Sequence, residues 1–295
     1  YTQWLNEKGG IEADLTVTRL SETAYLIVTG AETEVKDFNW LKRHTPEDAH
    51  AVLTNVSSGM GVISIMGPNS RALLQSISPN DLSHEAFPFA TSQEIELGYA
   101  IVRASRITYV GELGWELYIP TEFMAGVYDA IVAAGAAFGL KHCGYHALNA
   151  LRMEKAYRHW GHDITDEDTP LEAGLGFAVK MDKAGGFIGR EALAAQKEAG
   201  LKQRLVQFLV KSPEPMLYHN EPIWQGDRIA GYIRSGMYAH TLGGACGLGY
   251  VDAADGGVVG PIGADDYEIE IAGVRYPVTA SLKPFYDPTN ARIKI

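Results

Sequence analysis

Apolar and polar residues alternate over the first part of the chain in the way expected of paired strands. Ile11, Ala13, Leu15 and Val17 fall on one parity, and the positions between them are polar. A period of two predicts a strand with one buried face. A second apolar run over 24–28 follows a short break, so we expect the two segments to pair as a hairpin.

Further along, apolar residues recur at helical spacing. This spacing predicts helices over 32–43, 69–77 with Asn69 as N-cap, from Thr121 to about 139, over 145–159, and over 190–197. Strands are predicted over 62–66, 98–103 and 115–119. In the helix over 145–159, Tyr145, Asn149 and Arg152 are spaced to share one face.

After Gly200 the pattern changes to short strands separated by turns. Strands are predicted over 204–210, 222–224, 228–233 and 247–251, followed by a hairpin over 268–279 that turns at Ala272 and Gly273. This texture is typical of a small all-β module. We therefore predict two domains, 1–200 and 201–295, with no internal repeat.

Composition narrows the class of protein. The chain has 295 residues, 46 % of them hydrophobic, with 25 Lys and Arg against 36 Asp and Glu and a net charge of −11. This is ordinary globular composition, and the acidic balance argues against nucleic acid as the main partner. The two cysteines allow no disulfide framework, which favours a reducing compartment. No apolar run is long enough for a membrane helix. Because the chain begins at Tyr1 inside a segment that reads as ordered, we expect that N-terminal sequence is missing.

Several common kinds of site are disfavoured. His142 and His146 lie one helical turn apart but lack the Glu of a zinc-binding HExxH motif. The acidic residues between 163 and 168 lack the glycine and glutamate of a calcium loop. No dinucleotide-binding fingerprint and no nucleophile elbow occur. We predict no metal site and no covalent catalysis.

Two carboxylates on predicted strands are better candidates for chemistry. Asp14 lies in the middle of a strand, where Asp is uncommon. Glu116 shares a strand face with Tyr118 and follows a glycine-bracketed turn that carries Tyr109. A ring beside a fixed carboxylate suits a flat heterocycle that donates hydrogen bonds. The alternative interpretation is that both faces simply meet water.

Three segments, in order, resemble the signatures of the glycine-cleavage T-protein (aminomethyltransferase) family. They read GGIEADL over 9–15, YVGELGWEL over 109–117 and PLEAGL over 170–175. More narrowly, MEKAYRHWG over 153–161, FIGREAL over 187–193 and PFYDP over 284–288 are similar to the folate-binding half of the dimethylglycine and sarcosine oxidising enzymes. The resemblance covers essentially the whole chain.

The resemblance implies an α+β fold, a T-protein-like cloverleaf of mixed α/β subdomains that binds tetrahydrofolate and ends in a small β-barrel. It also implies that the start of the folate domain and an FAD-dependent amine-oxidising domain precede this chain. The implied partners are that FAD domain and a methylated glycine-type amine, with neither nucleic acid nor membrane. The implied location is the bacterial cytoplasm, or the mitochondrial matrix in a eukaryote.

The family's functional residues transfer to matching positions. Asp14 matches the catalytic carboxylate beside the folate nitrogens that accept the one-carbon unit. Glu116 matches the carboxylate that pairs with the pterin edge. The cofactor-binding positions implied around them are Tyr1, Val28, Tyr109, Tyr118 and Arg152.

The resemblance implies that an iminium from flavin-dependent oxidation is captured as 5,10-methylenetetrahydrofolate. One alternative is the aminomethyltransferase of glycine cleavage, disfavoured by Trp115 and by the His159-Trp160-Gly161 segment. A second is a folate-binding module without catalysis, against which the retained Asp14 speaks. A third is a two-domain, β-rich binding protein without enzymatic activity.

Overall fold

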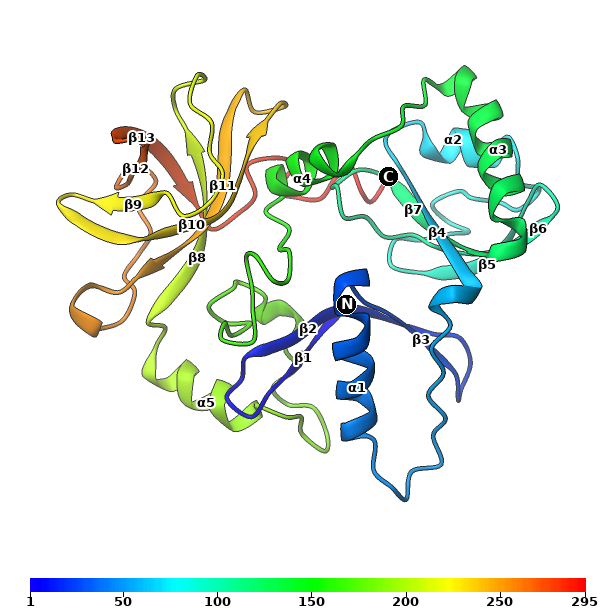
Figure 1. The fold of residues 1–295 in the computed structure, drawn as a ribbon, viewed down its shortest axis with the longest axis horizontal. Helices are drawn as coiled ribbons and strands as arrows, with labels where there is room; N and C mark the ends of the chain where they lie inside the picture. The colour runs from blue at the N-terminus through cyan, green and yellow to red at the C-terminus, as the bar shows by residue number, and fades with distance from the viewer. The chain divides into compact units, whose positions relative to one another are not determined.

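The computed structural model describes residues 1–295, which form two compact units that interleave along the sequence. Unit 1 comprises residues 1–47 and 156–286, and unit 2 comprises residues 48–155 and 287–295. Figure 1 shows the ribbon with the elements labelled. No helix is both long and apolar enough to cross a bilayer.

Unit 1 opens with an antiparallel sheet in the order β1-β2-β3. Its strands are β1 (Thr2–Leu5), β2 (Ile11–Arg19) and β3 (Tyr25–Val28), and α1 (Glu34–His44) follows. Ile11, Ala13 and Leu15 are buried, which confirms the predicted strand parity. Sequence patterning did not predict β1, because four residues are too few to show a period. Helix α5 (Arg190–Ala199) supplies Leu193 to the core beneath this sheet.

The rest of unit 1 is a closed six-stranded barrel in the order β10-β11-β8-β13-β12-β9. Its strands are β8 (Gln203–Val210), β9 (Pro222–Gln225), β10 (Arg228–Ala239), β11 (Gly244–Asp252), β12 (Glu268–Ile271) and β13 (Val274–Ser281). The predicted all-β module is confirmed, and so is its last turn. Ala272 and Gly273 have φ of 51° and 80°, the left-handed pair that a two-residue hairpin turn requires.

Unit 2 contains an antiparallel sheet in the order β4-β7-β6-β5. The strands are β4 (Met60–Met66), β5 (Ser92–Leu97), β6 (Ala100–Ser105) and β7 (Gly114–Pro120). One face packs with α2 (Ser70–Gln75) and α3 (Met124–Gly135) around the fully buried Trp115. Strand β5 was not predicted, because only two of its residues, Ile95 and Leu97, are apolar. Both are buried in the structure.

One local prediction is wrong. Helix α4 covers Tyr145–Glu154 rather than 145–159. It ends there because Ala156 adopts a left-handed φ of 53°, which interrupts the helical hydrogen-bond ladder. Asn69 occupies the N-cap position of α2, as predicted, but its side chain makes no capping hydrogen bond, and its Nδ2 donates to the carbonyl of Phe138 instead.

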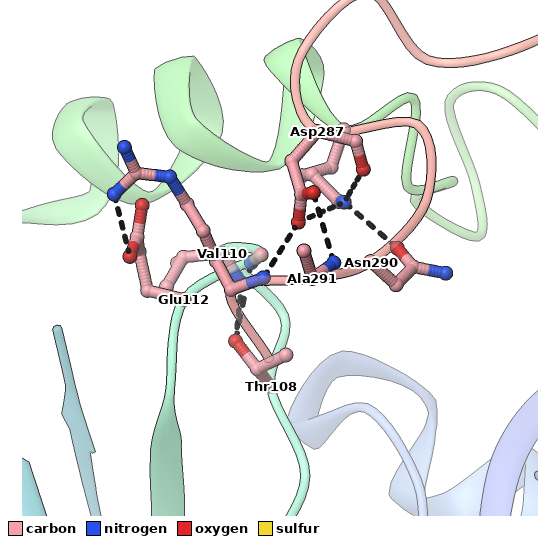
Figure 2. Close-up of polar contacts among 9 residues, drawn as sticks. Thr108, Val110, Glu112, Asp287, Asn290 and Ala291 are labelled. Atoms are coloured by element: carbon pink, nitrogen blue, oxygen red, sulfur yellow. Dashed lines mark hydrogen bonds and ion pairs between the residues drawn. The ribbon is translucent and has the colours of Figure 1, made fainter. Parts of the chain in front are cut away.

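Unit 2 is completed by residues that follow the barrel. Lys155 is buried, and its Nζ donates to the carbonyl of Asp287 at 2.7 Å and to Asn290 Oδ1 at 2.8 Å. The carboxylate of Asp287 lies 3.4 Å from the same nitrogen and accepts the backbone N–H groups of Ala291 and Arg292 (Figure 2). We call residues 287–295 the C-terminal strap. The two compact units interleave along the sequence, so they do not correspond to the predicted domains 1–200 and 201–295. That domain division stays a prediction.

Candidate functional site

The sequence-predicted site residues fall into two groups, one in each unit. Asp14 heads the first group, half-buried in the middle of β2. Gln3 stands directly opposite it on β1, and Gln3 Nε2 donates to Asp14 Oδ1 at 2.7 Å. Val28 pairs with Thr16 in the sheet register, so its side chain lies on the same face as that of Asp14. The sheet therefore brings Asp14, Gln3 and Val28 to one surface.

Tyr1 and Arg158 complete the surroundings of Asp14. Desolvation and the charge and hydrogen bond of Asp14 raise the pKa of Tyr1, although the residue as a whole is 56 % exposed. The Arg158 guanidinium donates to the backbone carbonyls of Ala156 and Ala173. Its positive charge acts on both Asp14 and Tyr1.

The pKa of Asp14 is raised above its ordinary value. Desolvation is the main cause, and it outweighs the hydrogen bonds from Gln3 and Tyr1 and the charge of Arg158, all of which lower the pKa. A carboxylate with a raised pKa is a better proton acceptor than an ordinary aspartate. Asp14 is thus equipped to act as a general base.

Phe177 is a candidate that sequence reasoning missed. The residue is 79 % exposed, and its ring stacks with that of Tyr1 at a centroid distance of 6.2 Å and an interplanar angle of 21°. An exposed aromatic pair beside Asp14 offers a flat, apolar wall to a ligand. The available signal was its position two residues after the PLEAGL motif.

The second group lies on the face of the unit 2 sheet opposite the buried Trp115. Glu116 is half-buried on β7, with Ser64 and Ser105 opposite it on the neighbouring strands. Tyr118 OH donates to Glu116 Oε2 at 2.6 Å. Desolvation raises the pKa of Glu116, and the hydrogen bond from Tyr118 partly offsets this effect. The tyrosine fixes one carboxylate oxygen of Glu116, so the pair forms a preoriented acceptor.

The turn that carries Tyr109 is tightly held. Thr108 Oγ1 accepts the backbone N–H groups of Val110 and Gly111, as Figure 2 shows for Thr108 and Val110. Gly111 has φ of 73°, and a Cβ there would lie 2.1 Å from Lys155 Cγ. The turn therefore rests on the aliphatic stem of the buried lysine.

Arg152 is the least accessible of the predicted site residues. It lies on α4, is 3 % exposed, and its Nε donates to Asn149 Oδ1 at 3.2 Å. The predicted shared face of Asn149 and Arg152 is thus present. The buried guanidinium is anchored within unit 2, which suits a residue that organises the site's surroundings.

Two family models together match almost the whole chain. The model described as the GCVT N-terminal domain matches residues 1–183, and the model of the glycine cleavage T-protein C-terminal barrel domain matches residues 203–287. This chain belongs to the glycine cleavage T-protein family. The family recognised in its motifs is thereby confirmed.

Individual relatives agree with this membership. Human mitochondrial sarcosine dehydrogenase is 40 % identical over 100 % of this chain and 34 % of its own length. An aminomethyltransferase from Shouchella clausii is 35 % identical over 98 % of this chain and 76 % of its own length. The chain therefore spans about a third of the length of the sarcosine dehydrogenase that it matches.

A solved structure confirms the fold. The crystal structure of glycine cleavage system aminomethyltransferase T from Bartonella henselae superposes with a TM-score of 0.83 at 23 % identity. It covers 97 % of this chain and 75 % of the other. The mixed α/β architecture with a closed C-terminal barrel is thus the T-protein fold.

Proposed function

We propose that this chain is the tetrahydrofolate-binding, one-carbon-transferring part of an oxidative demethylase of the dimethylglycine and sarcosine type. The observation that carries the proposal is Asp14, a half-buried strand carboxylate with a raised pKa, held by Gln3 and flanked by the Tyr1–Phe177 ring pair. Membership of a family that includes aminomethyltransferases and sarcosine dehydrogenases supports the same conclusion.

Glu116 is proposed to bind the pterin edge. One carboxylate can accept two N–H donors from a 2-amino-pyrimidinone face at once. Because Tyr118 OH occupies one side of the carboxylate, the rotamer of Glu116 is set before a ligand arrives. Such preorganisation lowers the entropic cost of binding. Tyr109 and Arg152 are proposed to bind or orient the folate, and Tyr1 and Val28 to contact it beside Asp14.

The proposed reaction consumes an iminium formed by oxidation of an N-methyl amine. One folate nitrogen attacks the iminium carbon and loses its proton. The second folate nitrogen then attacks the same carbon, the bond to the amine nitrogen breaks, and the amine departs with one proton. The products are 5,10-methylenetetrahydrofolate, the demethylated amine and one released proton.

Asp14 is proposed to accept the proton from the attacking nitrogen and to stabilise the positive charge on the intermediate. Its raised pKa suits the first role, because proton transfer is more favourable to a stronger base. Its negative charge suits the second role, since a fixed anion beside a developing cation lowers the barrier.

The proposal places the oxidation on a separate FAD-containing domain, which would supply the flavin chemistry and most of the amine pocket. A methylated glycine-type amine is the proposed substrate class. The proposed location is the bacterial cytoplasm, or the mitochondrial matrix in a eukaryote.

A glycine-cleavage aminomethyltransferase is the second candidate. The Shouchella clausii relative favours it, because this chain covers 76 % of that protein. In that case the one-carbon unit would come from a lipoylated carrier protein. Turnover with a lipoyl-bound aminomethyl group, and none with a methylated amine and the FAD domain, would select this candidate.

Anaerobic calorimetric titration with tetrahydrofolate tests the proposed site. We expect micromolar binding that Glu116→Ala weakens by more than about tenfold. Glu96→Ala is the matched control, because Glu96 is an exposed carboxylate on the same sheet, and it should leave binding unchanged. Absence of binding by the wild-type protein joined to its FAD domain would overturn the proposal.

Kinetics separate the roles of the two carboxylates. Asp14→Asn should lower folate-coupled turnover more than it lowers folate affinity, because its proposed role is in the chemical step. Glu116→Ala should instead weaken binding itself. Equal losses of turnover and affinity in both variants would contradict this separation.

A further inference from the structure

Gln3 joins Asp14 across the strand pair by a short hydrogen bond. The two residues are direct partners in the β1–β2 register, and Gln3 Nε2 lies 2.7 Å from Asp14 Oδ1. Cross-strand partners on one face are held at a fixed separation by the backbone ladder. The amide is therefore kept against the carboxylate by the sheet itself.

The other end of the same amide has no partner. Gln3 Oε1 is a buried acceptor without a hydrogen-bond donor. A buried acceptor without a donor destabilises a folded protein, so its presence calls for a reason. A site that receives a donor from a ligand provides one.

Asp14 dictates which way the amide faces. An ionised carboxylate only accepts hydrogen bonds, so the NH₂ group of Gln3 must point toward it. The carbonyl oxygen must then point away from Asp14. A rotation of the amide to satisfy Oε1 elsewhere would break the bond to Asp14 and place two oxygens against each other.

We infer that Gln3 is a positioning residue that orients the Asp14 carboxylate through Nε2 and accepts, through Oε1, an N–H group of a bound secondary amine. This inference rests on the proposed function, in which the amine is the reduced folate. Both reacting nitrogens of reduced folate carry N–H groups until the one-carbon unit is attached. Gln3 would thus recognise folate that is ready to react and hold it beside its base.

Two other groups act on Asp14. Tyr1, which immediately precedes β1, hydrogen-bonds to its carboxylate, and the positively charged Arg158 approaches from the segment after α4. Both, like Gln3, favour the ionised carboxylate. Removal of the Gln3 donor should therefore raise the pKa of Asp14 while the remaining groups stay in place.

The first test needs no folate. In Gln3→Leu, which keeps the shape but removes both polar ends, the pKa of Asp14 followed by carboxyl ¹³C NMR should rise. Thr2→Val on the opposite strand face is the control and should leave that pKa unchanged. An unaltered pKa in a folded Gln3→Leu protein would overturn the orienting role, even if the proposed function fails.

The second test compares two ligands. Gln3→Leu should weaken tetrahydrofolate binding by about tenfold but leave binding of 5,10-methylenetetrahydrofolate unchanged, because the latter lacks N–H on both reacting nitrogens. Equal weakening of the two ligands would overturn the role of Oε1. Failure of the wild-type protein to bind either ligand would instead refute the proposed function.

Discussion

Asp14 combines burial with several groups that favour its charge. The balance leaves its pKa raised, mainly through desolvation, so the folded protein binds a proton more tightly at this site than the unfolded chain does. The free energy of unfolding must then fall as pH rises from the ordinary aspartate value of about 3.9 to the higher folded value. At pH values above the folded-state pKa, the loss of unfolding free energy remains at its full value.

Replacement of Asp14 tests that sign. Asp14→Asn cannot ionise, so its free energy of unfolding relative to wild type should increase when the pH is raised from about 4 to about 7. Urea unfolding of both proteins at the two pH values measures the change. Asp265→Asn is the control, because the Asp265 side chain is 72 % exposed. A stability difference that does not vary with pH would refute the raised pKa.

Sequence reasoning selected Asp14 and Glu116 as candidates because a carboxylate inside a β-forming run is conspicuous and because both lie in recognisable motifs. It did not find the Tyr1–Phe177 pair or the link between Gln3 and Asp14. Phe177 lies far along the chain from Tyr1, and the register that opposes Gln3 to Asp14 depends on a bulge between Trp4 and Leu5. Neither feature can be read from local spacing.

Among the elements, the turn that carries Tyr109 depends on a single glycine. Gly111 has a left-handed φ and rests on Lys155, whose ammonium is fixed by the C-terminal strap. A side chain at this position would meet both backbone strain and a neighbour that cannot move away.

Two alanine substitutions separate these costs. Gly139 has φ of 72°, almost the same as Gly111, but a Cβ there meets nothing within 4 Å. Gly139→Ala should cost about 1–2 kcal/mol from the left-handed conformation alone. Gly111→Ala should cost clearly more, because its Cβ also overlaps the Lys155 stem. Thermal unfolding measures both, and equal losses would show that the lysine contact is unimportant.

Element prediction succeeded where the chain carries its own signal. The Ala272–Gly273 turn is marked by residues suited to left-handed backbone, and the alternation in β2 is marked by its period. It failed for the end of α4, where the chain departs from the helix at an alanine with positive φ. There the surrounding structure overrides local preference, since alanine is otherwise a strong helix former.

At the scale of the whole molecule, the C-terminal strap contributes a counter-charge to the interior of unit 2. Desolvation lowers the pKa of Lys155, and Asp287 partly restores it. Removal of one member of a buried ion pair leaves the other charged group uncompensated. The two members are therefore not equivalent.

We expect Asp287→Ala to cost about 3–5 kcal/mol of unfolding free energy, and Lys155→Met to cost less, because methionine fills the stem's space without a charge to bury. The double variant should then be more stable than Asp287→Ala alone. The control is Asp265→Ala, which breaks an exposed pair with Lys211 and should cost at most about 1 kcal/mol. Chemical denaturation gives all four values, and a larger loss in Lys155→Met than in Asp287→Ala would contradict this account.

Patterning predicted the barrel and its place after residue 200, because its strands are short, regular and punctuated by turns. It could not predict that the strap leaves the barrel to complete unit 2. The strap's apolar residues show no period, and its polar residues meet partners elsewhere in the chain. The anchoring lysine lies 132 residues before Asp287.

That separation has a consequence for synthesis. At about 5–20 residues per second, a ribosome needs roughly 7–26 s to pass from Lys155 to Asp287. During this interval the lysine lacks the strap's carboxylate and its two other oxygen acceptors, so unit 2 cannot complete its final packing. The barrel strands are therefore translated before the strap. The last residues of the chain then complete unit 2, whose sheet was translated much earlier.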